Sequence, residues 1–335
     1  MHEAVFWEKE KENRVRCSLC RFRCLIPSGK RGRCGVRENR SGTLYTLVYG
    51  QSIAENIDPI EKKPLFHYHP GSLSYSIATV GCNFRCLHCQ NYGISQWPHE
   101  RPIGGRDLSP AEIVEHAVAA GCRSIAYTYT EPTIYYEYAY DTAVLARQHG
   151  LGNVFVTNGY ITPEALEKIA PYLDAANVDL KAFSDDFYRE VTGAKLQGVL
   201  ETLQHYKKLG IWLEITTLII PGRNDDEAQL KNIAHFIADK LGAETPWHIT
   251  AFHPAYRMSD LPVTPPETLS KAWEIGRQAG LQYIYEGNLQ NSREDTLCPG
   301  CQKPVIERVR FRVERNKIEA GRCPFCGTPI PGINL

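Results

Sequence analysis

The chain has 335 residues, 43% of them hydrophobic, so it is long enough to bury one large core or two smaller ones. Lys plus Arg and Asp plus Glu both number 38, so the formal net charge is zero and no global positive field argues for a nucleic-acid partner. A local basic patch still leaves RNA or DNA open as a partner. No apolar run reaches the length of a membrane span, and the charged start of the chain lacks the apolar segment of a signal peptide. These features predict a soluble, cytoplasmic protein with no membrane partner.

Twelve cysteines are the most unusual feature of the composition. Cys122 stands alone and is predicted to be a small core residue. In a long chain without a signal peptide, Cys pairs two residues apart favour metal over disulfides. The chain is therefore divided into a Cys-rich N-terminal region (1–71), a central α/β domain (72–290) and a C-terminal metal-binding module (291–335). The remaining cysteines form three clusters: Cys17, Cys20, Cys24 and Cys34; Cys82, Cys86 and Cys89; and Cys298, Cys301, Cys323 and Cys326.

The N-terminal cluster lies in a segment rich in Arg and Lys, ahead of a short β-rich stretch, TLYTLVYG. Its spacing is Cys17-x2-Cys20-x3-Cys24-x9-Cys34. Basic neighbours stabilise thiolates and anionic clusters. The four cysteines thus predict a second metal site, which is either a zinc loop or another iron–sulfur site, and we favour zinc at this stage.

The central region alternates apolar, strand-like runs with helix-like segments. Ser109 and Pro110 form an N-cap and first helical position, and Pro132 begins another helix. Strands that are apolar on both faces and alternate with helices predict a parallel sheet covered by helices. A partial (βα)6-type barrel is the leading form, and a doubly wound open sheet is the alternative. The expected strands lie within 73–80, 124–130, 153–159, 175–183, 210–222, 247–254 and 281–287, and the other expected helices within 161–173, 196–210 and 226–242.

The sequence GCNFRCLHCQN follows the first of these strands and places Cys82, Cys86 and Cys89 on one tight loop. Ligands of parallel α/β folds bind at this carboxyl end of the strands. A closed zinc site needs four ligands, and His88 is too close to Cys89 to be the fourth without strain. Three thiolates suit a cubane cluster in which one iron is left for another ligand. The loop therefore predicts a [4Fe–4S] cluster, and three cysteines without metal are the alternative.

The fragment CNFRCLHC resembles the CxxxCxΦC motif of radical S-adenosylmethionine (SAM) enzymes, with His88 at the usually aromatic position. The resemblance implies that SAM chelates the open iron and is cleaved reductively to methionine and a 5′-deoxyadenosyl radical. The cofactor would supply this chemistry, and the protein would orient it and exclude solvent. Within the superfamily, the central region resembles the activating enzymes of glycyl-radical enzymes.

Short fragments after later strands carry that resemblance along the central region, and each alone is a weak signal. The resemblance implies contacts with the ribose and carboxylate of SAM after the fourth strand, with adenine after the fifth and with the nucleoside after the sixth. The implied residues are Thr157 and Asn158 in TNGY, Asp179 and Lys181 in DLK, Pro221 and Gly222 in IIPGRNDD, and His253 in FHP.

Two departures from the activating enzymes concern the methionine half of the predicted SAM site. Their GGE sequence is replaced by YTYTEPT, so that only Glu131 is retained and a hydroxyl of Thr130 or Thr128 replaces a close backbone contact. Val156 stands where an Asp often precedes TNG. The plainer interpretations are a helix-capping role for Glu131, a solvated pair at the end of the fourth strand, and an ordinary loop histidine after the sixth.

The C-terminal module contains Cys298-x2-Cys301-x21-Cys323-x2-Cys326 around a predicted β-ribbon. Two Cys-x2-Cys turns present four thiolates tetrahedrally, as in zinc ribbons and rubredoxins. The spacing predicts a metal site with zinc or iron, of which we favour zinc. A structural role is expected because so short a module cannot bury a core unaided. The alternative is a rubredoxin-like iron that relays an electron.

Both ends of the chain extend the resemblance. CxLCxxxCxIxxGxxGxCGVR, YTYTEPT, HPxYRM and the C-terminal double knuckle together resemble the AmmeMemoRadiSam subgroup of radical SAM proteins. That resemblance implies AMMECR1-like and Memo-like partners, a flavodoxin- or ferredoxin-type electron donor, and an unidentified protein substrate that is activated or modified. A small molecule or an RNA base is the alternative substrate. A metal-ribbon scaffold without activity is the alternative of a different class.

Overall fold

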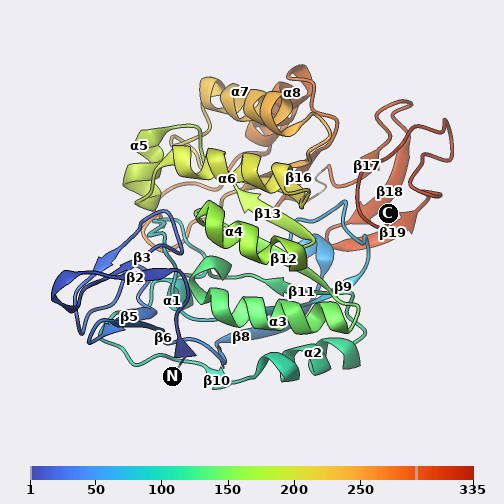
Figure 1. Ribbon diagram of the computed structural model, residues 1–335. Coiled ribbons are helices and arrows are strands. Elements are labelled where there is room, and N and C mark those ends of the chain that lie inside the picture. Colours follow the sequence, from blue (N-terminus) through green and yellow to red (C-terminus); the bar gives the residue numbers. More distant parts are fainter. Residues whose placement is uncertain (1, 291–292) are drawn as a thin grey trace. The chain divides into compact units, whose positions relative to one another are not determined.

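The computed structural model describes residues 2–290 and 293–335 (Figure 1). The chain forms two compact units. The first contains the residues up to Asp58 and Leu73–Asp174, and the second contains Pro59–Ser72 and Ala175–Leu335. This division follows which segments pack together, and the three regions drawn from the sequence stay a prediction.

Parallel strands form the centre of the first unit. Strand β11 (Ser124–Tyr127) lies between β9 (Leu73–Ala78) and β12 (Gly152–Thr157). All four residues of β11 are buried, as expected for a strand covered on both faces. Helices α2 (Pro110–Ala119) and α3 (Tyr136–Gln148) connect these strands and lie alongside each other (Figure 1).

Helix α2 shows why these boundaries can be predicted from the sequence. The Ser109 hydroxyl accepts a hydrogen bond from the Glu112 backbone N–H at 3.2 Å, and the Glu112 carboxylate accepts one from the Ser109 backbone N–H at 2.7 Å. This capping box satisfies two N–H groups that have no partner within the helix. The helix accordingly begins at the expected proline, Pro110.

The rest of the first unit consists of short antiparallel strands and short helices. Two three-stranded sheets, with orders β1-β6-β5 and β2-β3-β4, are built from its N-terminal part, β7 pairs antiparallel with β10, and β8 lies beside β9 in the sheet that contains the parallel strands. The elements are β1 (His2–Glu3), β2 (Trp7–Lys9), η1 (Lys11–Asn13), β3 (Val15–Cys17), β4 (Leu25–Ile26), β5 (Arg37–Arg40), β6 (Thr43–Thr46), β7 (Gln51–Ser52), β8 (Ala54–Pro59), α1 (Tyr92–Ser95), β10 (Arg106–Asp107), η3 (Pro132–Tyr135), α4 (Pro163–Ile169) and η4 (Ala170–Tyr172).

Four parallel strands form the second unit, in the order β13-β14-β15-β16. A three-stranded antiparallel sheet, β17-β18-β19, forms the C-terminal module. Helix α8 has no counterpart among the expected elements. The bounds are η2 (Ile60–Lys62), β13 (Ala175–Asp179), α5 (Asp185–Phe187), η5 (Tyr188–Thr192), α6 (Leu196–Lys208), β14 (Trp212–Ile219), α7 (Glu227–Phe236), η6 (Ile237–Leu241), β15 (Trp247–Ala251), α8 (Pro266–Gln278), β16 (Ile284–Gly287), β17 (Thr296–Leu297), β18 (Pro304–Val309) and β19 (Arg312–Asn316).

The expected parallel strands and covering helices are confirmed, and closure into a barrel stays a prediction. Several strands end earlier than expected. Strand β11 stops at Tyr127, because Tyr129 adopts a left-handed backbone (φ 61°) that cannot continue a ladder. Strand β13 stops at Asp179. The polar residues after both strands therefore belong to loops.

Buried polar groups fasten the 59–72 segment and the C-terminal module to the strands of the second unit. The Glu214 carboxylate lies 2.6 Å from His248 Nε2 and accepts the backbone N–H of His67 at 2.8 Å. His67 Nε2 lies 2.6 Å from the hydroxyl of Tyr285 on β16. Arg308 on β18 donates at 2.7 Å to the carbonyl of the residue before His67. Sequence positions more than 200 residues apart thus share one hydrogen-bonded core.

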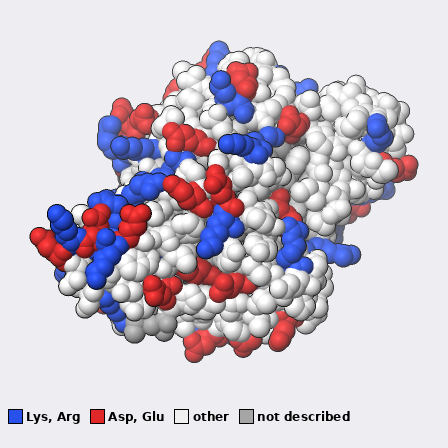
Figure 2. All heavy atoms as spheres, viewed as in Figure 1, with Lys and Arg blue, Asp and Glu red and all other residues white. Residues whose placement is uncertain are grey.

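Charged side chains of both signs are interspersed on the face shown in Figure 2, without one large basic area. This distribution agrees with the zero net charge of the sequence. Within residues 2–290 and 293–335, no helix combines the length and apolar character needed to cross a lipid bilayer.

Candidate metal and cofactor site

The Cys82–Cys89 loop follows strand β9 and is largely buried. Cys82 and Cys86 are each 8% exposed, and Cys89 is half-buried. The Phe84 backbone N–H donates to Cys82 Sγ at 3.4 Å, and Cys89 Sγ lies 3.1 Å from the Ser95 hydroxyl. Hydrogen bonds to sulfur stabilise ligating thiolates.

Burial raises the pKa of the Cys82 thiol well above its ordinary value, and the nearby Glu131 and Cys86 raise this pKa further. A thiolate at this position therefore needs a compensating positive charge. A coordinated metal supplies such a charge and deprotonates the thiol outright.

Two asparagines place amide groups beside the Cys82 sulfur. Asn158 Nδ2 lies 3.9 Å from Cys82 Sγ and donates to Asn83 Oδ1 at 2.7 Å. Asn83 is fully buried, and its Nδ2 has no hydrogen-bond partner among the residues that the structure describes. An unpaired buried donor is costly unless a ligand accepts from it. The donor set thus fits an anionic sulfur cluster with a polar ligand.

Glu131 is fully buried, and both of its oxygens are occupied by protein donors. Oε1 accepts from the Thr133 backbone N–H at 3.0 Å and the Thr157 hydroxyl at 2.7 Å, and Oε2 accepts from the Asn158 backbone N–H at 2.8 Å. Burial raises the pKa of Glu131, and these hydrogen bonds oppose the increase. The carboxylate therefore holds the turn after β12 in place. The predicted residues Glu131, Thr157 and Asn158 come together beside Cys82.

Thr130 and His88 are two further predicted residues of the first unit. Thr130 follows β11, and His88 lies within the Cys82–Cys89 loop. The Thr130 hydroxyl donates to the Thr79 carbonyl at 2.9 Å, which ties the end of β11 to the end of β9. His88 is 5% exposed. The Thr130 hydroxyl keeps its oxygen lone pairs as acceptors.

In the second unit, Asp179 at the end of β13 forms an ion pair with Lys181, with 2.7 Å between Oδ2 and Nζ. The Gly222 backbone N–H donates to Asp225 Oδ1 at 2.8 Å, and Gly222 has a left-handed backbone (φ 70°) that suits glycine. Pro221 is half-buried. His253 is exposed, and its Nε2 lies 3.2 Å from the Asn288 carbonyl oxygen.

Asn224 was not predicted as a site residue, although it organises the loop after β14. It is fully buried. Its Nδ2 donates to the Lys181 carbonyl at 2.6 Å and to the Leu218 carbonyl at 2.9 Å, and its Oδ1 accepts the Ile220 backbone N–H at 2.6 Å. An Asn two residues after a Pro-Gly turn is the signal that could have identified it.

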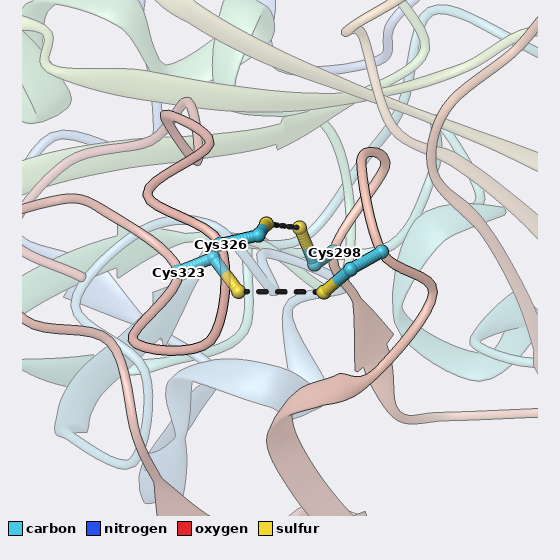
Figure 3. Close-up of side chains that lie close together, drawn as sticks. Cys298, Cys323 and Cys326 are labelled. Atoms are coloured by element: carbon cyan, nitrogen blue, oxygen red, sulfur yellow. Dashed lines mark hydrogen bonds between the residues drawn. The ribbon is translucent and has the colours of Figure 1, made fainter.

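The four C-terminal cysteines converge on one point. Their sulfur atoms all lie within 4.8 Å of one another, a property that no other set of three or more Cys, His, Asp or Glu ligand atoms shows among the described residues. Cys298 and Cys326 sulfurs are 3.5 Å apart, and Cys301 and Cys323 sulfurs are 3.7 Å apart (Figure 3). Tetrahedral coordination at about 2.3 Å requires sulfurs about 3.8 Å apart. The geometry fits a single metal ion.

Two features of this module match its proposed metal. Cys298 and Cys323 are buried in an apolar cluster with Phe66, Tyr283 and Ile330. Hydrogen bonds from the Thr328 hydroxyl and backbone lower the pKa of the exposed Cys326 to about 6. The choice between zinc and iron stays a prediction.

The N-terminal cysteines line one cavity, together with Arg33, Arg37 and Ile134. Cys17 and Cys34 are buried, and Cys20 and Cys24 are half-buried. Burial is the main factor that raises the pKa of Cys34 to about 11, and it also raises the pKa of Cys20. The predicted second metal site is therefore a group of neighbouring residues in space as well as in sequence. Cys122 is buried elsewhere in the core, 5% exposed.

Comparison with known proteins gives a family for the central region. The sequence profile described as the radical SAM superfamily matches residues 76–235. The protein MJ0808 of Methanocaldococcus jannaschii is 49% identical over 333 residues, which cover 98% of this chain and 99% of that protein. The name of that relative states no activity.

More distant relatives have named activities. The pyruvate formate-lyase-activating enzyme of Clostridium pasteurianum is 23% identical over 49% of this chain and 69% of its own length. A probable GTP 3′,8-cyclase of Pyrobaculum aerophilum is 26% identical over 66% of this chain and 76% of its own length. The crystal structure of a radical SAM methyltransferase from Sphaerobacter thermophilus has a TM-score of 0.51 at 16% identity, covering 66% of this chain and 68% of that one. At that identity the likeness concerns the fold alone.

Proposed function

We propose that the chain is a radical SAM enzyme that cleaves SAM reductively and uses the resulting radical to activate or modify a protein, because residues 76–235 match the profile of the radical SAM superfamily. A [4Fe–4S] cluster with one open iron, held by Cys82, Cys86 and Cys89, supplies the electron for this cleavage when bound. The observation that carries the proposal is the buried three-cysteine loop after a parallel strand, with the Asn158 amide beside a ligand sulfur.

The residues beside the cysteine loop prepare the methionine half of the SAM site. Asn83 offers its unpaired Nδ2–H, and the Thr130 hydroxyl offers an acceptor. Glu131 acts as a positioning residue, because its oxygens are already bonded to the turn that carries Thr157 and Asn158. His88 borders the cluster from within the loop.

Four further residues are proposed to bind the ribose, the carboxylate and the adenine of SAM, as the resemblance of the sequence implies. Asp179 accepts hydrogen bonds from the ribose hydroxyls, and Lys181 pairs with the carboxylate of SAM. The backbone at Pro221 and Gly222 meets adenine, in a loop that Asn224 holds rigid. His253 is exposed beside the nucleoside.

A protein substrate is supported by the similarity to a pyruvate formate-lyase-activating enzyme. The subgroup resemblance of the sequence adds AMMECR1-like and Memo-like proteins as proposed partners and a flavodoxin- or ferredoxin-type electron donor. A nucleotide-sized substrate is the second candidate, because a probable GTP 3′,8-cyclase is similar over a longer part of the chain. Anaerobic incubation with isotopically labelled extract fractions, one of proteins and one of small molecules, separates the two.

The test of the central proposal is a triple variant, Cys82→Ala, Cys86→Ala and Cys89→Ala, in the anaerobically reconstituted full chain. We expect 5′-deoxyadenosine formation with SAM and dithionite to fall to background. Cys122→Ala is the matched control, because it removes a buried cysteine outside the three clusters and should keep full cleavage. Persistent cleavage in the triple variant would overturn the proposal.

A further inference from the structure

The N-terminal cysteines surround a small cavity. This cavity is lined by Cys17, Cys20, Cys24 and Cys34 and has a volume of about 20 Å³. Its cysteines come from the end of β3, from the loop before β4 and from the turn before β5. All of them belong to the first unit, like the Cys82–Cys89 loop.

The spacing of these sulfurs distinguishes between one metal ion and a cluster. Among the described residues, no three of the four N-terminal sulfurs gather within 4.8 Å of one another, whereas all four C-terminal sulfurs do. A single zinc ion requires sulfurs about 3.8 Å apart. The loop of Cys82, Cys86 and Cys89 also lacks such a close group. The described N-terminal sulfurs therefore lack the close spacing of a single-ion site, which the C-terminal sulfurs have.

We propose that Cys17, Cys20, Cys24 and Cys34 bind a second iron–sulfur cluster of the [4Fe–4S] type, which goes beyond the proposed SAM chemistry. Three cysteines within eight positions and a fourth ten residues further along supply one thiolate for each iron. All four irons are then held by the protein, so this cluster leaves no iron open for SAM. It takes the place of zinc, which the sequence favours only slightly.

A buried arginine supplies a donor to the proposed cluster. Arg37 lines the cavity and is 2% exposed. Its Nη1 is 3.0 Å from a Glu137 carboxylate oxygen, but its Nε has no hydrogen-bond partner among the residues that the structure describes. Donors to sulfur set the charge balance and the potential of iron–sulfur clusters. An N–H directed to sulfur would give Arg37 Nε the partner it lacks.

The loops of the two proposed clusters touch directly. Arg33, next to Cys34, donates from Nε to the Asn83 carbonyl at 3.0 Å, and Arg85 donates to the Arg33 carbonyl. A Cβ built on Gly81 would lie 2.8 Å from the Cys34 carbonyl oxygen, so glycine permits this approach. The rings of Phe22, Phe84 and Tyr160 pack together between the loops, with centroids 4.8 to 6.4 Å apart.

This contact gives the second cluster a role that rests on the proposed function. An electron from a flavodoxin- or ferredoxin-type carrier enters at the N-terminal cysteines and passes to the Cys82 site. The carrier is oxidised by one electron, and the Cys82 site is reduced by one. The N-terminal cluster returns to its starting state.

The experiment is metal analysis of the full chain after anaerobic reconstitution, with iron, sulfide and zinc counted per chain and clusters followed by electron paramagnetic resonance. We expect about eight irons, four in each cubane. The variant Cys20→Ser with Cys24→Ser should keep about four irons, and the Cys82→Ala, Cys86→Ala, Cys89→Ala variant should also keep about four. Cys122→Ala should keep all eight. Zinc at the C-terminal cysteines reports that each variant is folded.

The outcomes separate this inference from the proposed function. The second cluster is overturned if the wild type binds about four irons and the Cys82 triple variant binds none. It is also overturned if the Cys20→Ser, Cys24→Ser double variant (the Cys20 variant) loses only two irons or loses one zinc. Iron that stays at eight in the Cys82 triple variant instead overturns the proposed function. The Cys20 variant should cleave SAM at near wild-type rate with dithionite and at least tenfold more slowly with the carrier protein. Equal slowing with both reductants overturns the electron-transfer role.

Discussion

Each unit contains a set of four cysteines beside a three-stranded antiparallel sheet, and the two sets have different geometries. The N-terminal set is Cys17, Cys20, Cys24 and Cys34, and the C-terminal set is Cys298, Cys301, Cys323 and Cys326. The C-terminal set consists of two Cys-x2-Cys turns separated by a β-ribbon, and its sulfurs lie within 4.8 Å of one another. The N-terminal set follows one continuous winding segment and lines a cavity. Two knuckles facing each other bring sulfurs to the spacing of one ion. Among the described residues, the N-terminal loop does not bring three sulfurs together at that spacing.

Both sets contain four cysteines, so their number does not identify the metal. The distances between the sulfur atoms must also be known. A further difference is charge. Arg33 and Arg37 line the N-terminal cavity, whereas the C-terminal cysteines pack against Phe66 and Tyr283. The basic surroundings of the N-terminal cysteines suit an anionic, redox-active cluster. The apolar surroundings of the C-terminal cysteines suit a metal that stabilises a small core.

The largest expected difference between the two regions is their response to oxygen. After exposure of the reconstituted protein to air, we expect nearly all iron to be lost from the Cys82 and N-terminal sites, because exposed iron–sulfur clusters are oxidised. The C-terminal site should keep about one zinc per chain, since zinc has no redox chemistry. Iron and zinc are measured before and after gel filtration. Loss of zinc in parallel with iron would contradict the distinction.

The C-terminal cysteines should matter for folding and not for SAM cleavage. Cys323→Ser with Cys326→Ser should abolish zinc binding and loosen β18 and β19, because structural zinc sites obtain roughly 10 kcal/mol or more from the metal. Amide exchange in these strands should accelerate at least ~100-fold, while the iron content and dithionite-driven SAM cleavage stay unchanged. A red, reducible iron in a wild-type chain would identify the rubredoxin-like alternative.

The second unit should also respond to mild acid. Burial is the main cause that lowers the pKa of His67 to about 4. Its Nδ1 donates to the Pro331 carbonyl at 2.8 Å, so its Nε2 accepts from the Tyr285 hydroxyl and the ring stays neutral. Below its ordinary pKa of about 6.5, the unfolded chain takes up a proton that the folded chain refuses. Stability is therefore lost as the pH falls from about 6.5 to about 4.

This loss should reach up to ~3 kcal/mol at the lower end of that window. Urea unfolding at pH 7 and pH 5, followed by the fluorescence of the second unit, measures it. His67→Gln is the matched variant, because its amide offers a donor and an acceptor but does not titrate. It should be less stable at pH 7 and should lose less stability on acidification. An identical pH profile in both chains would show that another group is responsible.

The smallest effect is expected at the strand ends, where the two units present different carboxylates. Asp179 has a side chain that is 35% exposed and pairs with Lys181, whereas Glu131 is buried and accepts from several donors. Asp179→Asn should weaken SAM binding by about 1–3 kcal/mol without lowering the melting temperature. Glu131→Gln should lower the melting temperature as well. Equilibrium SAM binding and thermal unfolding of both variants provide the measurement.

Much of the parallel fold could be predicted because its signals are local. The Ser109 cap and the prolines at the starts of α2 and η3 are visible in the sequence, and the apolar runs identify the buried strands. Helix α8 was missed although it buries Leu269, Ala272, Ile275 and Gly276 on one face. The division into two units could not be predicted, since Pro59–Ser72 joins the second unit through contacts with residues such as Glu214 and Arg308.

The candidate site shows the same limit. Short motifs identified Cys82, Glu131 and Asn158 as chemically important, and a contact between Glu131 and SAM stays a prediction. In the structure its oxygens are occupied by Thr133, Thr157 and Asn158. Asn83 and Asn224 were missed because a buried amide is recognised only by the partners it has or lacks.

By itself, the sequence determined which residue types carry the chemistry and the order of the strands and helices, because cysteine spacing, caps and apolar periodicity act over a few residues. It determined that three cysteine clusters exist. The distances between the sulfurs follow from the fold, because Cys301 and Cys323 lie on turns before β18 and after β19 and meet only when these strands pair. Coordination depends on those distances and on the donors around them, such as the unpaired Nε of Arg37.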